Sequence, residues 1–518
     1  GRLHPQSLRK RLRTVPEKGT VLFVFSPGLV FLVIFPLKSY NRSTVHSERK
    51  AKPVKHRWKK AGALLLAVLL AAGTLTACSP EEAASSTLEE TDQLRLENDG
   101  KETSLVVAER FFSTERTAAL EEIAEKYMAD FPQTRIEIVT VESGEEAMGM
   151  LQSGEADLVE LSEQEQPAAV EQGLLTELSP YLDVWEERST LTAAAKQAVA
   201  SMGADFAYLL PATLNQDLVY YRSDWFEEFN QGKEEGLVYC RIWEDFADAQ
   251  QKLQDKGAAG LVFGGKDRLV DLFDSILWSA VSLGRMEDPA ASYLSAVDEN
   301  DTLFTLEQAA AAVEQFSALI RDAVPQEALD WTEDQAIEAF TSGQAIALLA
   351  GQDRLEDIAG AMEEGTWGVA AYPRGTTGTA ITSLEFTGFG VAASAENVGN
   401  AVHFLTYLSN GDNNTHLAKA CGTVPIHTTA ADLEPSLEET GLSVNLLMVR
   451  RADWYFYAQE PLMYRAQEGW RETANQALQE FLAGEMAQQE LLASFDGYWS
   501  QARAGEGELW QAQEETEQ

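Results

Sequence analysis

The spacing of apolar residues after position 102 predicts an alternation of strands and helices. The run TSLVVAERFF has the character of a strand that ends near Phe112. In the next segment, STERTAALEEIAEKYMADFP, the larger apolar residues recur at the spacing of one helix face. Ser113 or Thr114 can cap this helix at its start, and Pro132 ends it.

Two more strands and a short helix follow in the same style. TRIEIVTV alternates apolar and polar residues, SGEEAMGMLQSG opens with a capping box of Ser143 and Glu146, and ADLVEL is a third strand. This order of strands and helices predicts parallel pairing with right-handed connections. Ligands of such sheets bind beyond the carboxyl ends of the strands, which points to residues 109–112 and 161–165.

Later segments predict the same mixture of strands and helices. AIEAFTSGQAIALLAG reads as helix, turn and strand, and TGFGVAASAENVGNAVHFLTYLSNG reads as strand, loop and helix. ANQALQEFLAGEMAQQELLASFDGYW predicts a helical pair around Gly484. No internal repeat is visible in the sequence.

An export signal is predicted ahead of this region. Residues 61–72 are uncharged, but this run is too short for a membrane span, which needs about 20 apolar residues. It fits the apolar part of a signal peptide, and basic residues between positions 55 and 60 precede it. The stretch LTAC, ending at Cys78, resembles the lipobox of bacterial lipoproteins. This resemblance implies cleavage before Cys78 and a lipid on its thiol; an ordinary transmembrane anchor is the alternative.

Three other segments are predicted to lie outside the fold. Residues 1–53 are interpreted as upstream sequence translated from a misplaced start, with residues 54–77 as the signal peptide. The alternative for residues 1–53 is a real second membrane segment. Residues 78–102 are expected to be the lipidated cysteine and a flexible acidic tether, and residues 506–518 an acidic tail.

The charge of the chain excludes one class of function. The formal net charge is −42, and basic residues are concentrated before Cys78, so the remainder is more acidic still. Such a chain does not bind nucleic acid through a phosphate-neutralising patch, and its charge favours neutral or cationic ligands over anionic ones. Its length favours two lobes. Cys240 and Cys421 are expected to be free thiols rather than a bridge.

Several segments, in order, resemble the extracellular solute-binding proteins of family 1, the sugar-binding subunits of ABC importers. They are SGEADLVEL, EQGLLTELSPYL, LLPATLNQDLVYYRSDWF, IWEDFADAQQKL, AFTSGQAIALLAG, WGVAAYPRG and CGTVPIH. Ala156 stands where the family usually has proline, and Arg222 and Ser223 replace its usual Asn-Lys. The resemblance covers about residues 103–500.

The resemblance implies an α/β, two-lobed periplasmic-binding-protein-like fold of type II, with lobes joined by strand crossovers. Lobe 1 would hold residues 103–212 with 391–430, and lobe 2 residues 213–390 with 431–505. A ligand would bind in the cleft between them, and the lobes would close by a hinge motion. The implied protein is a monomer at the extracellular face of the bacterial membrane. It captures a mono- or oligosaccharide for ABC permease subunits, without catalysis, cofactor or metal.

A bound sugar needs an aromatic surface for its C–H face and polar groups for its hydroxyls. Trp278, Trp454 and Trp470 are the candidates for stacking. The polar candidates lie at predicted strand ends and crossovers. They are Glu109, Asn215, Asp217, Asp353, Glu385 and Thr387.

Other functions were weighed against this one. GLVFGGKD approaches a P-loop, but Asp267 stands where Ser or Thr should meet Mg²⁺. A glycosidase needs only two carboxylates about 5–10 Å apart, so an acidic chain leaves that possibility open. Within the same fold, the alternative is a receptor for another neutral or cationic solute, such as a polyamine or peptide. A surface sensor or adhesin that feeds no transporter is the alternative of another class.

Overall fold

The computed structural model describes residues 96–202, 206–233, 236–237, 239–281, 302–375, 378, 380–438, 442–450, 454–457 and 464–504. The chain divides into two units, residues 1–88 and 89–518, and all described residues belong to the second. Cys78, the predicted signal segment and the tail at 506–518 lie outside the described residues. No helix in the described part combines the length and the apolar character that crossing a membrane requires.

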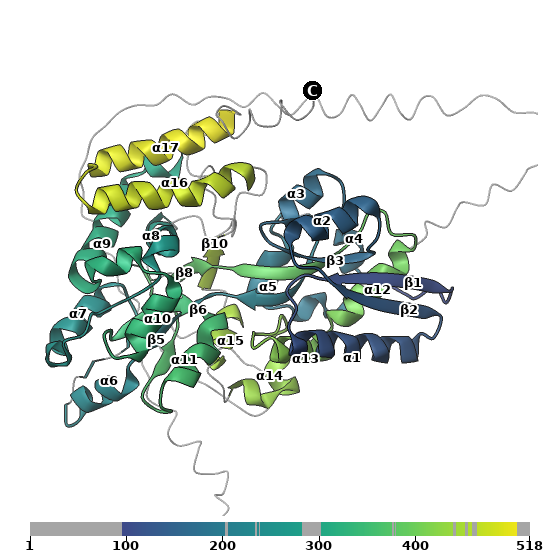
Figure 1. Cartoon of the computed structure of the whole chain (residues 1–518), viewed down its shortest axis with the longest axis horizontal. Helices are drawn as coiled ribbons and strands as arrows, with labels where there is room; N and C mark the ends of the chain where they lie inside the picture. Colours follow the sequence, from purple (N-terminus) through teal and green to yellow (C-terminus); the bar gives the residue numbers. More distant parts are fainter. Residues whose placement is uncertain are drawn as a thin grey trace, which may run out of the picture. The chain divides into compact units, whose positions relative to one another are not determined.

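A five-stranded sheet forms the first half of the fold, with strand order β2-β1-β3-β9-β4 (Figure 1). Its strands are β1 (Thr103–Glu109), β2 (Thr134–Thr140), β3 (Leu158–Ser162), β4 (Leu210–Asn215) and β9 (Glu385–Val391). β1 runs parallel to β2 and β3, which confirms the predicted parallel pairing. β9 is antiparallel to both β3 and β4.

Helix capping explains where the first two helices begin. The Ser113 hydroxyl accepts a hydrogen bond from the N–H of Arg116 at the start of α1 (Thr114–Asp130). Ser143 caps α2 (Gly144–Ser153) in the same way, as predicted. The carboxylate of Glu146 accepts from the N–H of Glu142 at 2.8 Å, so only the serine half of the expected capping box forms.

Helices cover the five-stranded sheet and enclose the first core, the apolar side chains of residues 105–214 and 386–449. Besides α1 and α2, they are α3 (Gln166–Glu171), α4 (Ser179–Leu182), α5 (Ala193–Val199), α12 (Val398–Leu408), α13 (Gly411–Ala420), α14 (Ala430–Leu433) and α15 (Ser443–Arg450).

Two smaller sheets belong to the second core, formed by apolar side chains of residues 218–381 and 466–502 with Met448. One has the antiparallel order β6-β5-β7, from β5 (Asp217–Tyr221), β6 (Ala347–Gly351) and β7 (Gly368–Ala370). The other pairs β8 (Ala380–Ser383) with β10 (Trp454–Tyr457) in parallel.

The helices of this half are α6 (Ser223–Asn230), α7 (Glu244–Lys252), α8 (Gly265–Val281), α9 (Glu307–Ala323), α10 (Glu333–Thr341), α11 (Leu355–Ala361), α16 (Tyr464–Leu482) and α17 (Gln488–Ala504). Short 3-10 turns are η2 (Glu186–Thr190), η3 (Gln254–Lys256), η4 (Leu303–Thr305), η5 (Gln326–Asp330), η6 (Gln352–Arg354) and η7 (Pro435–Glu438). α16 and α17 lie side by side in Figure 1 and are joined near Gly484, which confirms the predicted helical pair.

The chain crosses between the two halves at two short connections. Only Gln216 separates the end of β4 from the start of β5, and only Leu384 separates β8 from β9. The resemblance implied lobes joined by strand crossovers, and the strand pairings on either side of Gln216 and Leu384 confirm this. The lobe boundaries stay a proposal; after residue 431, Leu442 and Leu446 pack in the first core and Met448 packs in the second.

Candidate ligand-binding site

One edge of the five-stranded sheet brings the predicted site residues together. We call it the carboxyl edge: the ends of β1, β3 and β4 together with the start of the antiparallel β9. Ser162 at the end of β3 pairs with Thr387, and Asn215 at the end of β4 pairs with Glu385. Both crossovers therefore leave the sheet at this edge, which is where ligands of parallel α/β sheets bind.

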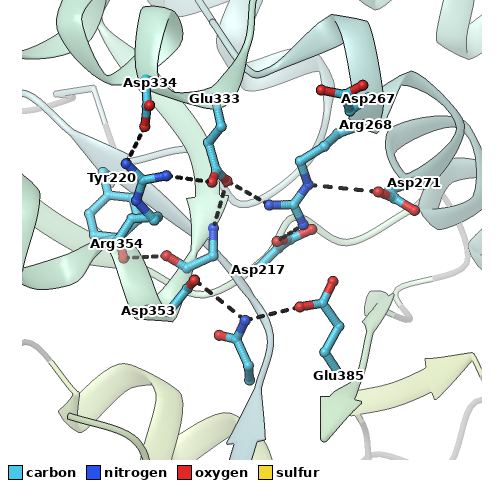
Figure 2. Close-up of polar contacts among 12 residues, drawn as sticks. Asp217, Tyr220, Asp267, Arg268, Asp271, Glu333, Asp334, Asp353, Arg354 and Glu385 are labelled. Atoms are coloured by element: carbon cyan, nitrogen blue, oxygen red, sulfur yellow. Dashed lines mark hydrogen bonds and ion pairs between the residues drawn. The ribbon is translucent and has the colours of Figure 1, made fainter. Parts of the chain in front are cut away.

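Asn215 joins two carboxylates that come from distant segments. Its amide nitrogen donates to Glu385 Oε2 at 3.1 Å and to Asp353 Oδ1 at 3.4 Å. Glu385 begins β9 in the first half, whereas Asp353 follows β6 in the second half. Asp353 and Glu385 lie on either side of this amide in Figure 2. The structure thus brings three of the predicted polar residues into direct contact.

Asp217, the fourth of these residues, is held by an arginine that the sequence analysis did not single out. Arg268 on α8 forms an ion pair with Asp217 and donates to Glu333 Oε1 at 2.7 Å (Figure 2). Glu333 also accepts from Arg354 through its other oxygen at 3.0 Å. Arg354 directly follows Asp353, so one connected network links Asp217 to the segment that carries Asp353.

Burial raises the pKa of two carboxyl groups in this region. Desolvation raises the pKa of Asp217 to about 6, although the nearby Arg268 guanidinium acts in the opposite direction. Burial and the charge of Glu333 also raise the pKa of Asp353. Arg268 and Arg354 are each shared among several carboxylates. The site therefore offers mainly hydrogen-bond acceptors, which suit hydroxyl or ammonium donors and repel anions.

Glu109 and Thr387 belong to a second, buried group at the same edge. Arg116 donates to Glu109 Oε1 at 2.8 Å and to Glu160 Oε1 at 2.5 Å. Thr117 donates its hydroxyl to Glu109 Oε2 at 2.7 Å, and Thr387 donates to Glu160 Oε1 at 2.6 Å. We call Glu109, Arg116 and Glu160 the buried ion triad. Glu109 is completely buried, so in this structure its carboxylate faces Arg116 and Thr117 rather than solvent.

The predicted tryptophans lie in other surroundings. Trp278 on α8 is 4% exposed and Trp470 on α16 is 1% exposed, both within the second core. Trp470 packs against Phe304, Phe495 and Trp499 with ring centroids 4.8–5.7 Å apart. The backbone of Trp454 is in β10, but its side chain lies outside the described residues. Stacking of these rings on a ligand stays a prediction.

Glu163 was not among the candidate site residues, although it lies within residues 161–165, which the sequence analysis pointed to. Its carboxylate accepts from the N–H of Phe386 at 3.2 Å, directly after Glu385. Burial, reinforced by the charge of Glu385, raises the pKa of Glu163 to about 7. Its position after β3, at the predicted carboxyl end, was the available signal. Among the described residues, no group of three or more His, Cys, Asp or Glu side chains has the arrangement of a metal site.

Comparisons with known proteins agree with this fold. Residues 122–442 match the family described as bacterial extracellular solute-binding protein. The chain belongs to this family, as its sequence motifs indicated. Its members are substrate-binding proteins rather than enzymes. A comparison with curated proteins finds no match.

Solved structures share the fold at low sequence identity. The sugar-binding protein MalE from Xanthomonas citri aligns with TM-score 0.63 and 13% identity, over 77% of this chain and 97% of that one. The cyclic alpha-maltosyl-1,6-maltose binding protein from Arthrobacter globiformis aligns with TM-score 0.61 and 17% identity, over 77% and 98%. Maltose-bound MalE3 of T. maritima gives 0.56 and 18%, over 78% and 99%. These likenesses show the two-lobed α/β fold.

Proposed function

We propose that this protein captures a mono- or oligosaccharide between its two lobes and delivers it to the permease subunits of an ABC importer. The observation that carries the proposal is the meeting of Asn215, Asp353 and Glu385 at the crossovers. These residues come from both halves of the fold, so a ligand bound there would contact both. The ligand would therefore stabilise the closed arrangement of the lobes, in which it contacts both halves, and this is the physical basis of hinge closure.

The chemistry of this group suits a hydroxyl-rich ligand. Each carboxylate can accept hydrogen bonds from neighbouring hydroxyls, and Asn215 can both donate and accept. A micromolar affinity corresponds to about −8 kcal/mol, which a few charge-assisted hydrogen bonds and one stacked ring can supply. The structural relatives named above bind maltose or related sugars according to their descriptions, which supports a carbohydrate for this chain.

The remaining parts of the proposal concern its cellular setting. Cys78 would carry the lipid that holds the protein at the outer face of the bacterial membrane, since two acyl chains give stable anchoring. Residues 54–77 would be the signal peptide, and the protein would act as a monomer. Replacing Cys78 with serine should abolish incorporation of a labelled fatty acid and release the protein from the membrane fraction. Labelling that persists in the Cys78→Ser protein would rule out this anchor.

A cationic solute is the second candidate, favoured by the excess of carboxylates around Asn215. A thermal-shift series on the full chain separates the two ligands. Neutral mono- and oligosaccharides, including maltose and maltotetraose, should raise the melting temperature, because a ligand that binds only the folded state stabilises it. Spermidine alone producing the shift would favour the cationic receptor. A sensor or adhesin would bind sugar yet support no uptake when expressed with its neighbouring permeases.

A further inference from the structure

Two adjacent phenylalanines are exposed at the carboxyl edge. Phe111 is 37% exposed and Phe112 is 45% exposed, and both follow the last residue of β1. By contrast, the tryptophans Trp278 and Trp470 are almost completely buried. The loop that carries these two rings therefore presents apolar surface at the same sheet edge from which both crossovers leave.

The buried ion triad fixes the backbone of this loop. The N–H groups of Arg110 and Phe111 donate to Glu160 Oε2 at 3.2 and 3.3 Å. Arg116 donates to the carbonyl oxygen of Phe111 at 3.1 Å, in addition to its bonds with Glu109 and Glu160. Three hydrogen bonds from two buried charged side chains thus hold two consecutive residues of an exposed loop.

Packing energy alone does not explain why a buried ion group lies beneath this loop. Burying an ion group costs desolvation energy, and apolar residues of similar volume often give equal or greater stability. An apolar replacement, however, offers no partners for the backbone N–H and C=O groups of an exposed loop. The triad also connects to the crossover, because Thr387 donates to Glu160 and lies two residues from Glu385, on the same face of β9.

We propose that Phe111 and Phe112 form a stacking platform for the apolar face of the bound carbohydrate, and that the buried ion triad positions this platform. The proposal rests on the carbohydrate-binding function given above. Aromatic rings bind the C–H face of a sugar, while Asn215, Asp353 and Glu385 serve its hydroxyls. A platform held rigid before binding loses little entropy when the ligand arrives, so pre-organisation increases affinity.

The two rings should contribute unequally. The guanidinium of Arg110 lies over the Phe111 ring, 4.7 Å from its centroid, and so covers one of its faces. Arg110 is itself within 3.6 Å of Glu165, which keeps it over the ring. Phe112 is the more exposed ring and is therefore the main contact. Phe112→Ala should lower the affinity for sugar about tenfold, and Phe111→Ala by less.

The test uses the full chain and a panel of neutral sugars that includes maltose, maltotetraose and raffinose. The sugar with the largest thermal shift on the wild-type protein is titrated by calorimetry into each variant. Tyr239→Ala is the matched control, since Tyr239 is also exposed but packs against Tyr221, 5.4 Å away between ring centroids. The platform predicts weaker binding for Phe112→Ala and unchanged binding for Tyr239→Ala.

The outcomes separate this proposal from the function on which it rests. If the wild-type protein binds a sugar and Phe112→Ala binds it equally well, the platform is wrong while carbohydrate capture stands. If the wild-type protein binds none of the sugars, both proposals fail. Equal losses in Phe112→Ala and Tyr239→Ala would also overturn the platform, because they would show a general response to removing an exposed ring.

The positioning role of the triad needs a readout beyond stability. Arg116→Lys is combined with Phe112→Ala in a double-mutant cycle of sugar affinity. If Arg116 acts through the platform, its effect on affinity should disappear once Phe112 has been removed. Additive losses would instead show that Arg116 influences binding by another route. Thr117→Val, which removes one hydrogen bond to Glu109, serves the same cycle if Arg116→Lys does not fold.

Discussion

Two arginine-centred networks lie at the junction of the two halves, and they differ in how much water reaches them. The side chain of Arg116 is 4% exposed, and its carboxylate partners Glu109 and Glu160 are fully buried. The side chain of Arg268 is 19% exposed, and its partners belong to a network that reaches the solvent-exposed Asp353. The first network is thus closed to solvent, whereas the second is partly open to it.

The two networks also take their members from different strands and helices. Glu109, Arg116 and Glu160 belong to β1, α1 and β3, which are all elements of the first half. Arg268 joins Asp217 on β5 to Glu333 on α10, across 51 and 65 positions of the sequence. In both networks burial raises the pKa of an aspartate or glutamate, Glu109 in one and Asp217 in the other. Similar groups of carboxylates around an arginine are therefore fully buried in the triad and partly exposed around Arg268.

The largest effect is expected from a substitution in the buried ion triad. Arg116→Leu leaves the carboxylates of Glu109 and Glu160 buried without a cation, and breaking a buried ion group costs about 3–5 kcal/mol. Urea denaturation should show this loss in the free energy of unfolding. Arg321→Leu is the control, because Arg321 pairs with Asp322 on the surface and its removal should leave the midpoint unchanged. Equal midpoints for the two variants would contradict a structural role for the triad.

A substitution of Asp353, in the partly exposed group around Asn215, should change the affinity for ligand rather than the stability of the fold. Asp353→Asn removes the charge of an exposed carboxylate that faces Asn215. A hydrogen bond to a charged group contributes about 1.5–3 kcal/mol, so the dissociation constant should rise about tenfold to a hundredfold. Glu364→Gln, also on the exposed surface after α11, is the charge-matched control. Calorimetry with the best-binding sugar measures both; identical affinities would remove Asp353 from the site.

Sequence reasoning placed several polar residues at the crossovers, and ligand binding by these residues or by the predicted tryptophans stays a prediction. Asn215, Asp217 and Glu385 were predictable because they flank crossovers that strand patterns and family motifs mark together. Arg268 and Glu333 were not, since their pairing depends on distances across the fold that no local pattern encodes. Helix α10 was visible in the sequence pattern, but which charged residues of α8 and α10 would face a crossover was not.

The surroundings of the aromatic residues were also not predictable from local sequence patterns. Trp278 is a stacking candidate from the sequence, and the structure places it on α8, where nearly all side chains from Leu269 to Val281 are buried. Phe111 and Phe112 were taken as the end of a strand. They leave the sheet because their loop bonds to the buried ion triad instead of a neighbouring strand.

A smaller effect should appear in the pH dependence of stability. The pKa of Glu163 is raised from 4.5 to about 7, mainly by burial, so the folded state binds the proton more tightly than the unfolded state. Its contribution to stability is fully present below pH 4.5, falls as the pH rises through about 7, and is constant above that. Glu163→Gln should flatten this fall. The difference between wild-type and variant urea midpoints from pH 4.5 to 8 isolates the effect, and parallel curves would refute it.

The smallest effect concerns Thr387, which bonds to the buried ion triad and lies near the crossover. The hydroxyl of Thr387 donates to Glu160 at 2.6 Å and contacts the Thr213 hydroxyl at 3.0 Å, while Glu385 lies two positions away on the same strand face. Thr387→Val keeps the shape but removes these bonds, so unfolding should become easier by about 1 kcal/mol. Thr387→Ser restores the hydroxyl and should recover most of that loss in urea denaturation. If Thr387→Ser is no more stable than Thr387→Val, the hydroxyl of Thr387 does not stabilise the fold through these hydrogen bonds.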